Sequence, residues 1–98
     1  MIKLRINPIV AKDLKDIKNF IAEDNPQMAL KTVRTIYDKF ATLQQFPNIG
    51  AELAKRVSFK TDYKYIVWNN YIIIYKKTKS HMEIYRVVSR FQDLTRIF

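Results

Sequence analysis

The run YIIIY at residues 71–75 constrains the fold of this 98-residue chain more than any other stretch, because it is apolar on both alternating faces. In an extended chain the two tyrosines and the middle isoleucine share one face, and the other two isoleucines share the opposite face. A strand with a single buried face would instead alternate apolar and polar residues. The run therefore predicts a central strand that is covered on both sides.

Two more runs rich in β-branched and aromatic residues flank the central one. They are YKYIVWNN at residues 63–70 and MEIYRVVS at residues 82–89, and short polar segments separate all three. Such spacing is typical of hairpin connections, so an antiparallel meander is the simplest arrangement. Ile2, Leu4 and Ile6 alternate with basic residues and predict a further strand at the N-terminus.

Two amphipathic helices are expected between the first strand and the meander. An Asn-Pro pair opens each of them, at residues 7–8 and 25–26, because Asn can accept hydrogen bonds from free amides and Pro fits the first helical position. The apolar stripes that follow have helical spacing: Val10, Leu14, Ile17 and Ile21 in the first helix, then Ala29, Val33, Ile36, Phe40 and Leu43 in the second. The short joint between them predicts an antiparallel hairpin.

The pattern as a whole predicts one α+β domain over residues 1–98. It consists of an N-terminal strand, an antiparallel helix hairpin and a three-stranded antiparallel meander, with the helices on one face of a small sheet. Pro47 and Gly50 end the second helix, and a loop to about Asp62 follows. Gly50, the single glycine, suits a position with positive φ. The second face of the sheet is left for a partner.

The charge of the chain is strongly positive and unevenly placed. The net charge is +9; residues 1–54 hold 8 Lys or Arg against 6 Asp or Glu, and residues 55–98 hold 10 against 3. The C-terminal half therefore carries +7 of the +9. This asymmetry indicates an anionic partner, either nucleic acid or an acidic protein, with a basic surface kept for solubility as the alternative.

The composition also excludes several kinds of site. The chain has no Cys and a single His81, so disulfides and thiolate metal sites are excluded, and we expect no metal and no cofactor. The N-terminus lacks the apolar core of a signal peptide, and no stretch approaches the roughly 18 apolar residues of a membrane span. We therefore expect a soluble, cytoplasmic protein with no membrane partner.

The C-terminal segment IYRVVSRFQDL, together with the Asn-Pro pairs, FPNIG and NYIIIYK, resembles the RelE/ParE superfamily of type II toxins, closer to its ParE-like branch. Members commonly end in Ile-x-Arg-Val-Leu-His-Gly-x-Arg-Asp-Leu. The residues that match this pattern are Ile84, Arg86, Val87, Asp93 and Leu94. The resemblance covers essentially the whole chain and implies a growth inhibitor that is neutralised by a cognate antitoxin.

The superfamily implies two chemistries. RelE-like members cleave mRNA on the ribosome, whereas ParE-like members poison DNA gyrase and are not known as hydrolases. Ser89 stands where many members have His, and Ile72 follows Tyr71 where the ribonucleases often have Arg. Two expected catalytic positions are thus empty, and arginines are poor general bases because they stay protonated. We favour a toxin that binds DNA gyrase, without catalytic residues.

The alternative is a ribosome-dependent mRNA endoribonuclease, an enzyme in which Lys64, Arg86 and Arg90 would clamp the scissile phosphate. In the favoured interpretation a basic docking surface contacts the target. Its expected residues are Arg56, Lys60, Lys64, Arg86, Arg90, Asp93 and Arg96. Arg56, Lys60 and Lys64 precede or enter the first strand of the meander and are expected to share a rim with Arg90. The partners are then the antitoxin and gyrase, or the ribosome and mRNA, and a homodimer is possible.

Two of these residues also have structural interpretations. Arg86 lies in an otherwise apolar strand, so its charge needs either a carboxylate such as Glu83 or Asp93, or an anionic target. Asp93 lies three residues after Arg90 and three before Arg96, a spacing that fits a small lattice of ion pairs. A third function remains open as well: a plain nucleic-acid-binding module, or an inactive toxin that is retained as an antitoxin partner.

Overall fold

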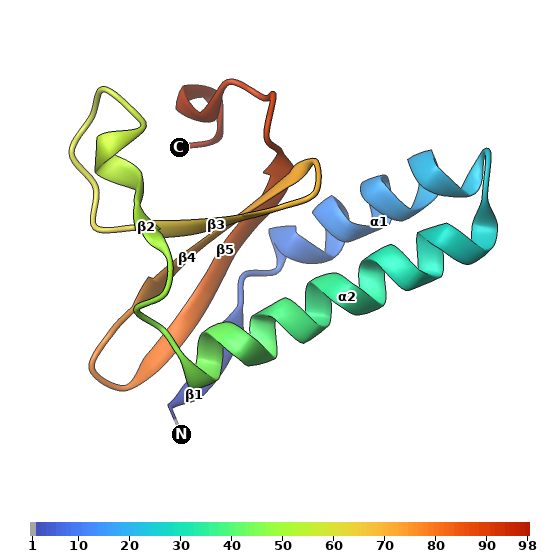
Figure 1. The fold of residues 1–98 in the computed structure, drawn as a ribbon. Helices are drawn as coiled ribbons and strands as arrows, with labels where there is room; N and C mark the ends of the chain where they lie inside the picture. The colour runs from blue at the N-terminus through green and yellow to red at the C-terminus, as the bar shows by residue number, and fades with distance from the viewer. Residues whose placement is uncertain (1) are drawn as a thin grey trace.

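The computed structural model describes residues 2–98 and has an α+β architecture in which a sheet lies between a helix hairpin and a C-terminal turn (Figure 1). The elements in chain order are β1 (Lys3–Ile6), α1 (Ile9–Ala22), α2 (Pro26–Gln45), β2 (Ala51–Glu52), η1 (Leu53–Lys55), β3 (Lys64–Trp68), β4 (Tyr71–Lys77), β5 (His81–Ser89) and η2 (Leu94–Ile97). The two η elements are short 3₁₀ helices.

The sheet has five strands in the order β1-β5-β4-β3-β2. The antiparallel meander is present as β3, β4 and β5, but the prediction of a three-stranded sheet was incomplete. β1 pairs with β5 in parallel, which makes the sheet mixed, and β2 pairs with the start of β3. A two-residue strand inside a predicted loop carries no period-2 pattern, and no local pattern gives the partner of a strand, so neither feature was visible in the sequence.

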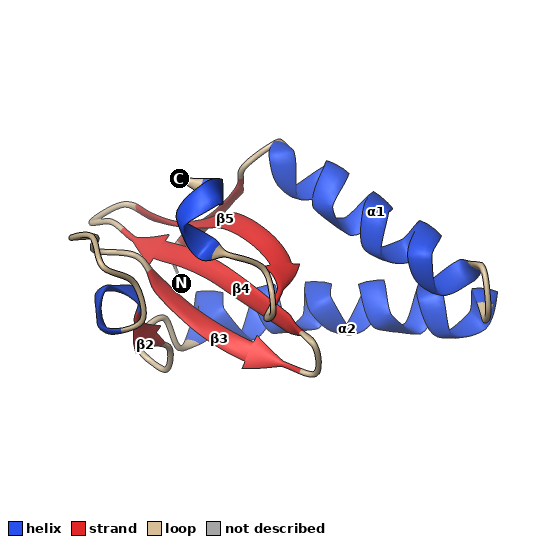
Figure 2. Ribbon diagram, turned by 90° about the horizontal axis from the view of Figure 1, so that it is seen from above, coloured by secondary structure: helices blue, strands red, loops and turns tan. Residues whose placement is uncertain are grey.

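Both helices begin close to the predicted positions. Asn25 caps α2, since its side-chain oxygen accepts a hydrogen bond from the amide of Met28 at 3.0 Å. α1 begins at Ile9, whose amide donates to Asn7 at 3.1 Å. The two helices run antiparallel and extend beyond the sheet at one end (Figure 2). α1 packs on β5, so the hairpin is anchored where the last strand leaves the sheet.

The central strand β4 is buried on both faces, as its sequence predicted: residues 72–75 have no exposed surface. On the helix face the core contains Val10, Leu14, Ile36, Phe40, Leu43, Ile73, Tyr75, Met82, Ile84 and Val87. On the second face a smaller core contains Leu53, Ile72, Ile74, Val88 and Leu94. The second face is therefore covered by the chain itself, through η1 and the C-terminal segment.

A β-bulge in β5 decides which residues reach the helices. Ile74 lies opposite Arg86, but the next residue, Tyr75, lies opposite Ile84, so Tyr85 is an extra residue on β5. A bulge shifts the alternation of faces by one. Ile84 and Val87 consequently pack into the same core, although an uninterrupted strand would place them on opposite faces.

Gly50 is required by a close contact, and the expectation of a positive φ was wrong. Its amide donates a hydrogen bond to the hydroxyl of Tyr75 at 2.9 Å, and that hydroxyl donates to the carbonyl of Pro47 at 2.8 Å. A Cβ at position 50 would lie only 2.8 Å from the Tyr75 ring and 2.9 Å from the carbonyl of Tyr65. The buried tyrosine thus ties the turn after α2 to the sheet.

Candidate functional site

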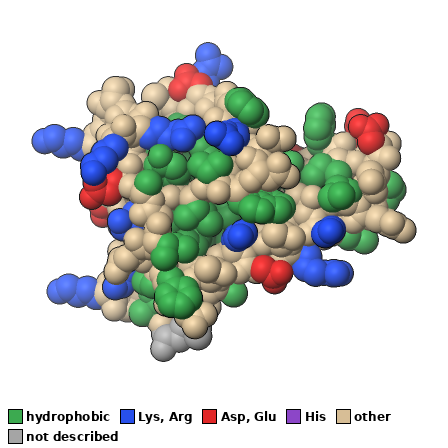
Figure 3. Space-filling model, viewed as in Figure 1, with side chains coloured by type: hydrophobic (Ala, Val, Ile, Leu, Met, Phe, Trp, Pro, Cys, Tyr) green, Lys and Arg blue, Asp and Glu red, His purple; other side chains and the backbone are tan. Residues whose placement is uncertain are grey.

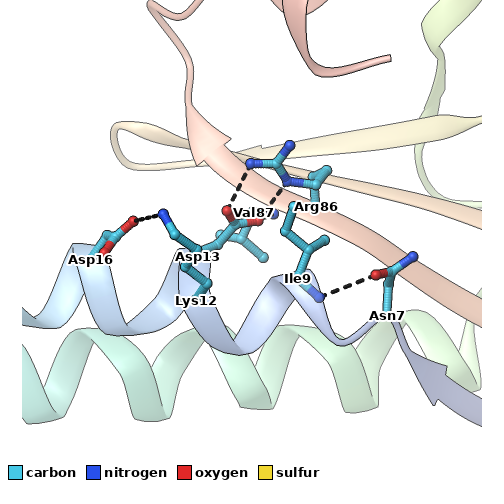
Figure 4. A network of polar contacts seen from close by, with 7 residues as sticks. All are labelled: Asn7, Ile9, Lys12, Asp13, Asp16, Arg86 and Val87. Atoms are coloured by element: carbon cyan, nitrogen blue, oxygen red, sulfur yellow. Dashed lines mark hydrogen bonds and ion pairs between the residues drawn. The ribbon is translucent and has the colours of Figure 1, made fainter.

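Arg86 is held by Asp13 in a bidentate ion pair that joins β5 to α1 (Figure 4). The Nε and Nη2 atoms of Arg86 donate to the two carboxylate oxygens of Asp13 at 2.9 and 2.8 Å. The amide of Val87 adds a third hydrogen bond to the same carboxylate, at 3.0 Å. We call these three residues the Asp13 clip.

The clip is largely shielded from water, since the side chains of Arg86 and Asp13 are 16% and 8% exposed. The hydrogen bonds from Arg86 to Asp13 raise the pKa of the guanidinium above its ordinary value. The partner is neither of the expected carboxylates, Glu83 or Asp93, but Asp13 of α1, the helix that packs on β5. Arg86 already has its counter-charge, so in this conformation it is not free to hold a phosphate.

Sequence reasoning missed Asp13, although a signal was present. Asp13 lies between Val10 and Leu14 in the chain and follows Val10 by three residues, which places it on the apolar stripe of α1. A carboxylate on a buried stripe needs a partner with complementary charge. A carboxylate on the buried stripe of a helix and an Arg in an apolar strand could therefore have been matched with each other from the sequence.

A groove of about 700 Å³ surrounds the clip. One wall is α1, and the other is the turn before β4, the end of β5 and the two residues after Arg90. The lining residues are Ile9, Lys12, Asp13, Asp16, Ile17, Phe20, Asn70, Tyr71, Arg86, Val87, Val88, Ser89, Phe91 and Gln92. Phe20 and Phe91 are 74% and 80% exposed, so large apolar side chains lie open on both sides of the groove. The exposed pair Lys12 and Asp16, 3.1 Å apart, marks its rim (Figure 4).

The C-terminal segment carries two of the predicted site residues, Asp93 and Arg96. Asp93 accepts hydrogen bonds from the amide and hydroxyl of Thr95, at 3.0 and 2.7 Å, and lies 3.8 Å from Arg96. The bonds from Thr95 hold the pKa of Asp93 below its ordinary value. Asp93 is therefore the cap of η2. The predicted lattice is present only on its Arg96 side, because no ion pair joins Asp93 to Arg90 among residues 2–98.

Arg56 and Arg90 lie at two ends of the same strand. The guanidinium of Arg56 lies 5.3 Å from the ring centre of Tyr65 in β3, and Nη1 of Arg90 lies 3.5 Å from the carbonyl of Asn69, just after β3. Arg90 also lies 5.8 Å from the ring centre of Phe91. Both arginines are exposed, and neither has a carboxylate within ion-pair distance in the described part of the chain.

Lys60 and Lys64 do not join this pair. Lys60 is exposed in the segment before β3, and Lys64 shares its strand face with Ile66 and Trp68, which pack against the helix-side core. The expected rim of Lys64 with Arg90 was wrong. β3 and β5 both run antiparallel to β4, so the start of β3 and the exit of β5 lie at opposite ends of the sheet, roughly 13 Å apart along the strands alone.

The described residues contain no group of three or more His, Asp or Glu side chains arranged to hold a metal ion. Within residues 2–98, neither helix has the length and apolar character that a membrane crossing requires.

A family model described as ParE toxin of type II toxin-antitoxin system, parDE, matches residues 4–94. The chain belongs to the ParE toxin family. Among the nine elements the match leaves out only Lys3 of β1 and residues 95–97 of η2, so it includes the Asp13 clip, the groove, Arg56 and Arg90.

A solved structure supports the ParE fold independently. The chain resembles a protein of the chromosomal ParDE TA system from P. aeruginosa, with a TM-score of 0.75 and 23% sequence identity. The alignment covers 91% of this chain and 96% of that one. At this identity the likeness concerns the fold. A search of curated proteins found no significant match.

Proposed function

We propose that this ParE-family chain is a cytoplasmic growth inhibitor that binds DNA gyrase, blocks replication and is neutralised by a cognate antitoxin. Family membership supports the toxin role. The observation that carries the choice of target is the Asp13 clip, because it holds Arg86, one of the three residues that a ribonuclease would need, in a shielded ion pair. The charge of Arg86 is already paired with a carboxylate, so it is not available to stabilise the charge of a scissile phosphate.

The remaining ribonuclease candidates support the same conclusion. Lys64 and Arg90 lie at opposite ends of the sheet, and Lys64 shares the helix face whereas Arg90 follows β5. General acid and base groups must lie within hydrogen-bond reach of one reacting group. Lys64, Arg86 and Arg90 do not form such a set, so the surface is better suited to docking than to cleavage.

We further infer that the antitoxin lies in the groove beside the Asp13 clip. The groove offers apolar side chains along α1 and an exposed phenylalanine on each side, which suits the apolar face of an amphipathic segment. Acidic residues of the same segment would meet exposed cations next to the groove, such as Lys12 and Arg90. Neutralisation then requires no change in the fold of the toxin.

Two assays on the purified chain test the target. We expect inhibition of gyrase supercoiling and accumulation of cleaved DNA at micromolar protein, and unchanged primer-extension products on translated message. Replacing Arg56 and Arg90 with Ala should weaken inhibition, whereas the matched pair Lys31→Ala and Arg34→Ala, which removes the same charge from exposed positions of α2, should not. New cleavages in translated message that disappear on Arg90→Ala, with gyrase unaffected, would assign the ribonuclease function instead.

A further inference from the structure

Two arginines whose charge nothing in the described chain offsets lie at the two ends of β3. Arg56 stacks on Tyr65 from one end of the strand, and Arg90 reaches the backbone just beyond the other end. The positions they contact are four residues apart, which separates them by roughly 13 Å along the strand. Val67 shares the Tyr65 face of β3 and is 40% exposed. We call Arg56, Tyr65, Val67 and Arg90 the β3 strip.

The segment before β3 and the C-terminal segment extend this basic surface. A cavity of about 370 Å³ is lined by residues 56–58 on one side and residues 92–95 on the other, so the two segments lie next to each other. Phe59 also packs on Phe98, with ring centres 5.2 Å apart. Figure 3 shows Lys and Arg side chains gathered around hydrophobic ones at the upper left, where Figure 1 places these segments.

Two other cations of these segments, Lys55 and Arg96, are held only loosely. Lys55 pairs with Glu52 at 3.3 Å and Arg96 with Asp93 at 3.8 Å, but all four side chains are more than half exposed. Ion pairs at such positions contribute little, so they exchange readily for another anion. The whole surface is therefore able to receive negative charge without disturbing a buried contact, in contrast to Arg86.

The chemistry of the strip distinguishes between anionic partners. A guanidinium binds a carboxylate as well as a phosphate, so the open aromatic surface beside the cations is what favours a nucleotide over an acidic peptide. The two cations of the strip are planar guanidiniums that lie near aromatic rings, and Phe91, beside Arg90, exposes 80% of its surface. Guanidiniums that bind phosphate, interleaved with open aromatic faces, are the features that recognise unpaired nucleotides.

We propose that the β3 strip, with the exposed ring of Phe91 beside Arg90, binds single-stranded nucleic acid. The two arginines contact phosphates, and a base stacks on Phe91. This inference deepens the proposed function, and the biological role of the binding rests on that function. A gyrase poison with such a surface would also hold the DNA of the cleaved complex. The binding itself needs neither gyrase nor ribosome.

Fluorescence anisotropy on the full chain tests the proposal, with labelled oligothymidylate and oligouridylate of about twelve nucleotides and a duplex of equal length. We expect both single strands to bind more tightly than the duplex. A plot of log affinity against log salt should have a slope of about −0.7 per phosphate contacted, so Arg56→Ala with Arg90→Ala should make it shallower by about 1.4. The two single-stranded probes also show whether DNA or RNA is preferred.

Matched variants separate this site from a general effect of charge. Lys31→Ala with Arg34→Ala removes the same charge from α2 and should leave the affinity and slope unchanged. Phe91→Ala should weaken single-strand binding about tenfold, and Phe91→Tyr should restore it, because the loss is that of a stacking partner. The positions are exposed, and thermal melting checks that each variant folds.

Three binding results would overturn the proposal: no saturable binding at roughly 50 mM salt, tighter binding of the duplex than of the single strands, or equal losses of affinity in both double variants. A fourth is competition by polyglutamate as strong as that by unlabelled oligonucleotide, which would assign the strip to an acidic peptide. A chain that inhibits gyrase but shows one of these results loses only this inference. A chain that binds the single strands but leaves gyrase active loses only the proposed target.

Discussion

At the scale of single residues, Asp13 is the side chain on which the joint between α1 and β5 depends. It accepts three hydrogen bonds, and its removal leaves Arg86 charged, mostly buried and unpaired. We expect Asp13→Ala to lower the free energy of unfolding by roughly 3–5 kcal/mol. Urea denaturation at neutral pH measures this loss.

The double variant Asp13→Ala with Arg86→Met tests the reason for that loss. Methionine has a similar length and removes the buried charge, so a large part of the lost stability should return. If the double variant were as unstable as Asp13→Ala alone, the unpaired charge of Arg86 would not be the cause of the instability.

Tyr75 gives a second prediction at this scale, and it depends on pH. Burial raises the pKa of Tyr75 above its ordinary value of 10.0, although the hydrogen bond from Gly50 acts in the opposite direction. The folded state therefore holds the phenolic proton more tightly than the unfolded chain does. This contribution to stability is complete below about pH 10 and is lost as the pH rises above that value, because the unfolded chain ionises first.

We expect Tyr75→Phe to lower the free energy of unfolding by about 1–3 kcal/mol at pH 7, since it leaves the carbonyl of Pro47 without its donor. Above about pH 10 the difference between the variant and the parent should shrink, because the parent alone loses the contribution of Tyr75. Guanidinium denaturation at the two pH values measures both effects. A difference that grows with pH would contradict the assigned direction of the shift.

At the scale of elements, Asn25 and Asn7 open the two helices with different geometry. Asn25 accepts from the amide three residues ahead, as an N-cap does, whereas Asn7 accepts from the amide two residues ahead and lies outside α1. We expect Asn25→Ala to lower stability by about 1 kcal/mol and Asn7→Ala by less. Thermal melting of both variants checks the order, and a larger loss for Asn7→Ala would show that the bond at Asn7 is the more important one.

The elements also show what the sequence can and cannot predict. Residues 71–75 predicted a buried central strand because burial on two faces requires an apolar or aromatic side chain at every position. The Asn-Pro pairs predicted the helix starts because capping depends on local chemistry. No sequence pattern predicted the bulge at Tyr85, because an extra residue in an apolar strand has a side chain of the kind that strands ordinarily contain. The partner of Arg86 lies 73 residues away in the chain, on α1, so the shape of the site depended on a long-range contact that local patterns do not contain.

At the scale of the whole molecule, the antitoxin groove and the β3 strip are separate surfaces that meet at residues 90–92. Phe91 and Gln92 line the groove, and Arg90 belongs to the strip. An antitoxin segment in the groove would cover the ring of Phe91 and so lower the affinity of the strip for its own ligand. By linkage, the ligand would lower the affinity of the antitoxin by the same factor.

Two substitutions far from the meeting point should separate the functions of these surfaces. Phe20 lies on the groove side of α1 and Arg56 at the far end of the strip, and both are exposed, so neither change should alter stability by more than about 0.5 kcal/mol. We expect Phe20→Asp to remain toxic but to escape neutralisation when toxin and antitoxin are expressed together. Arg56→Ala should lose much of its toxicity and still bind the antitoxin in a pull-down. If either variant lost both its toxicity and its antitoxin binding, the target and the antitoxin would share one surface.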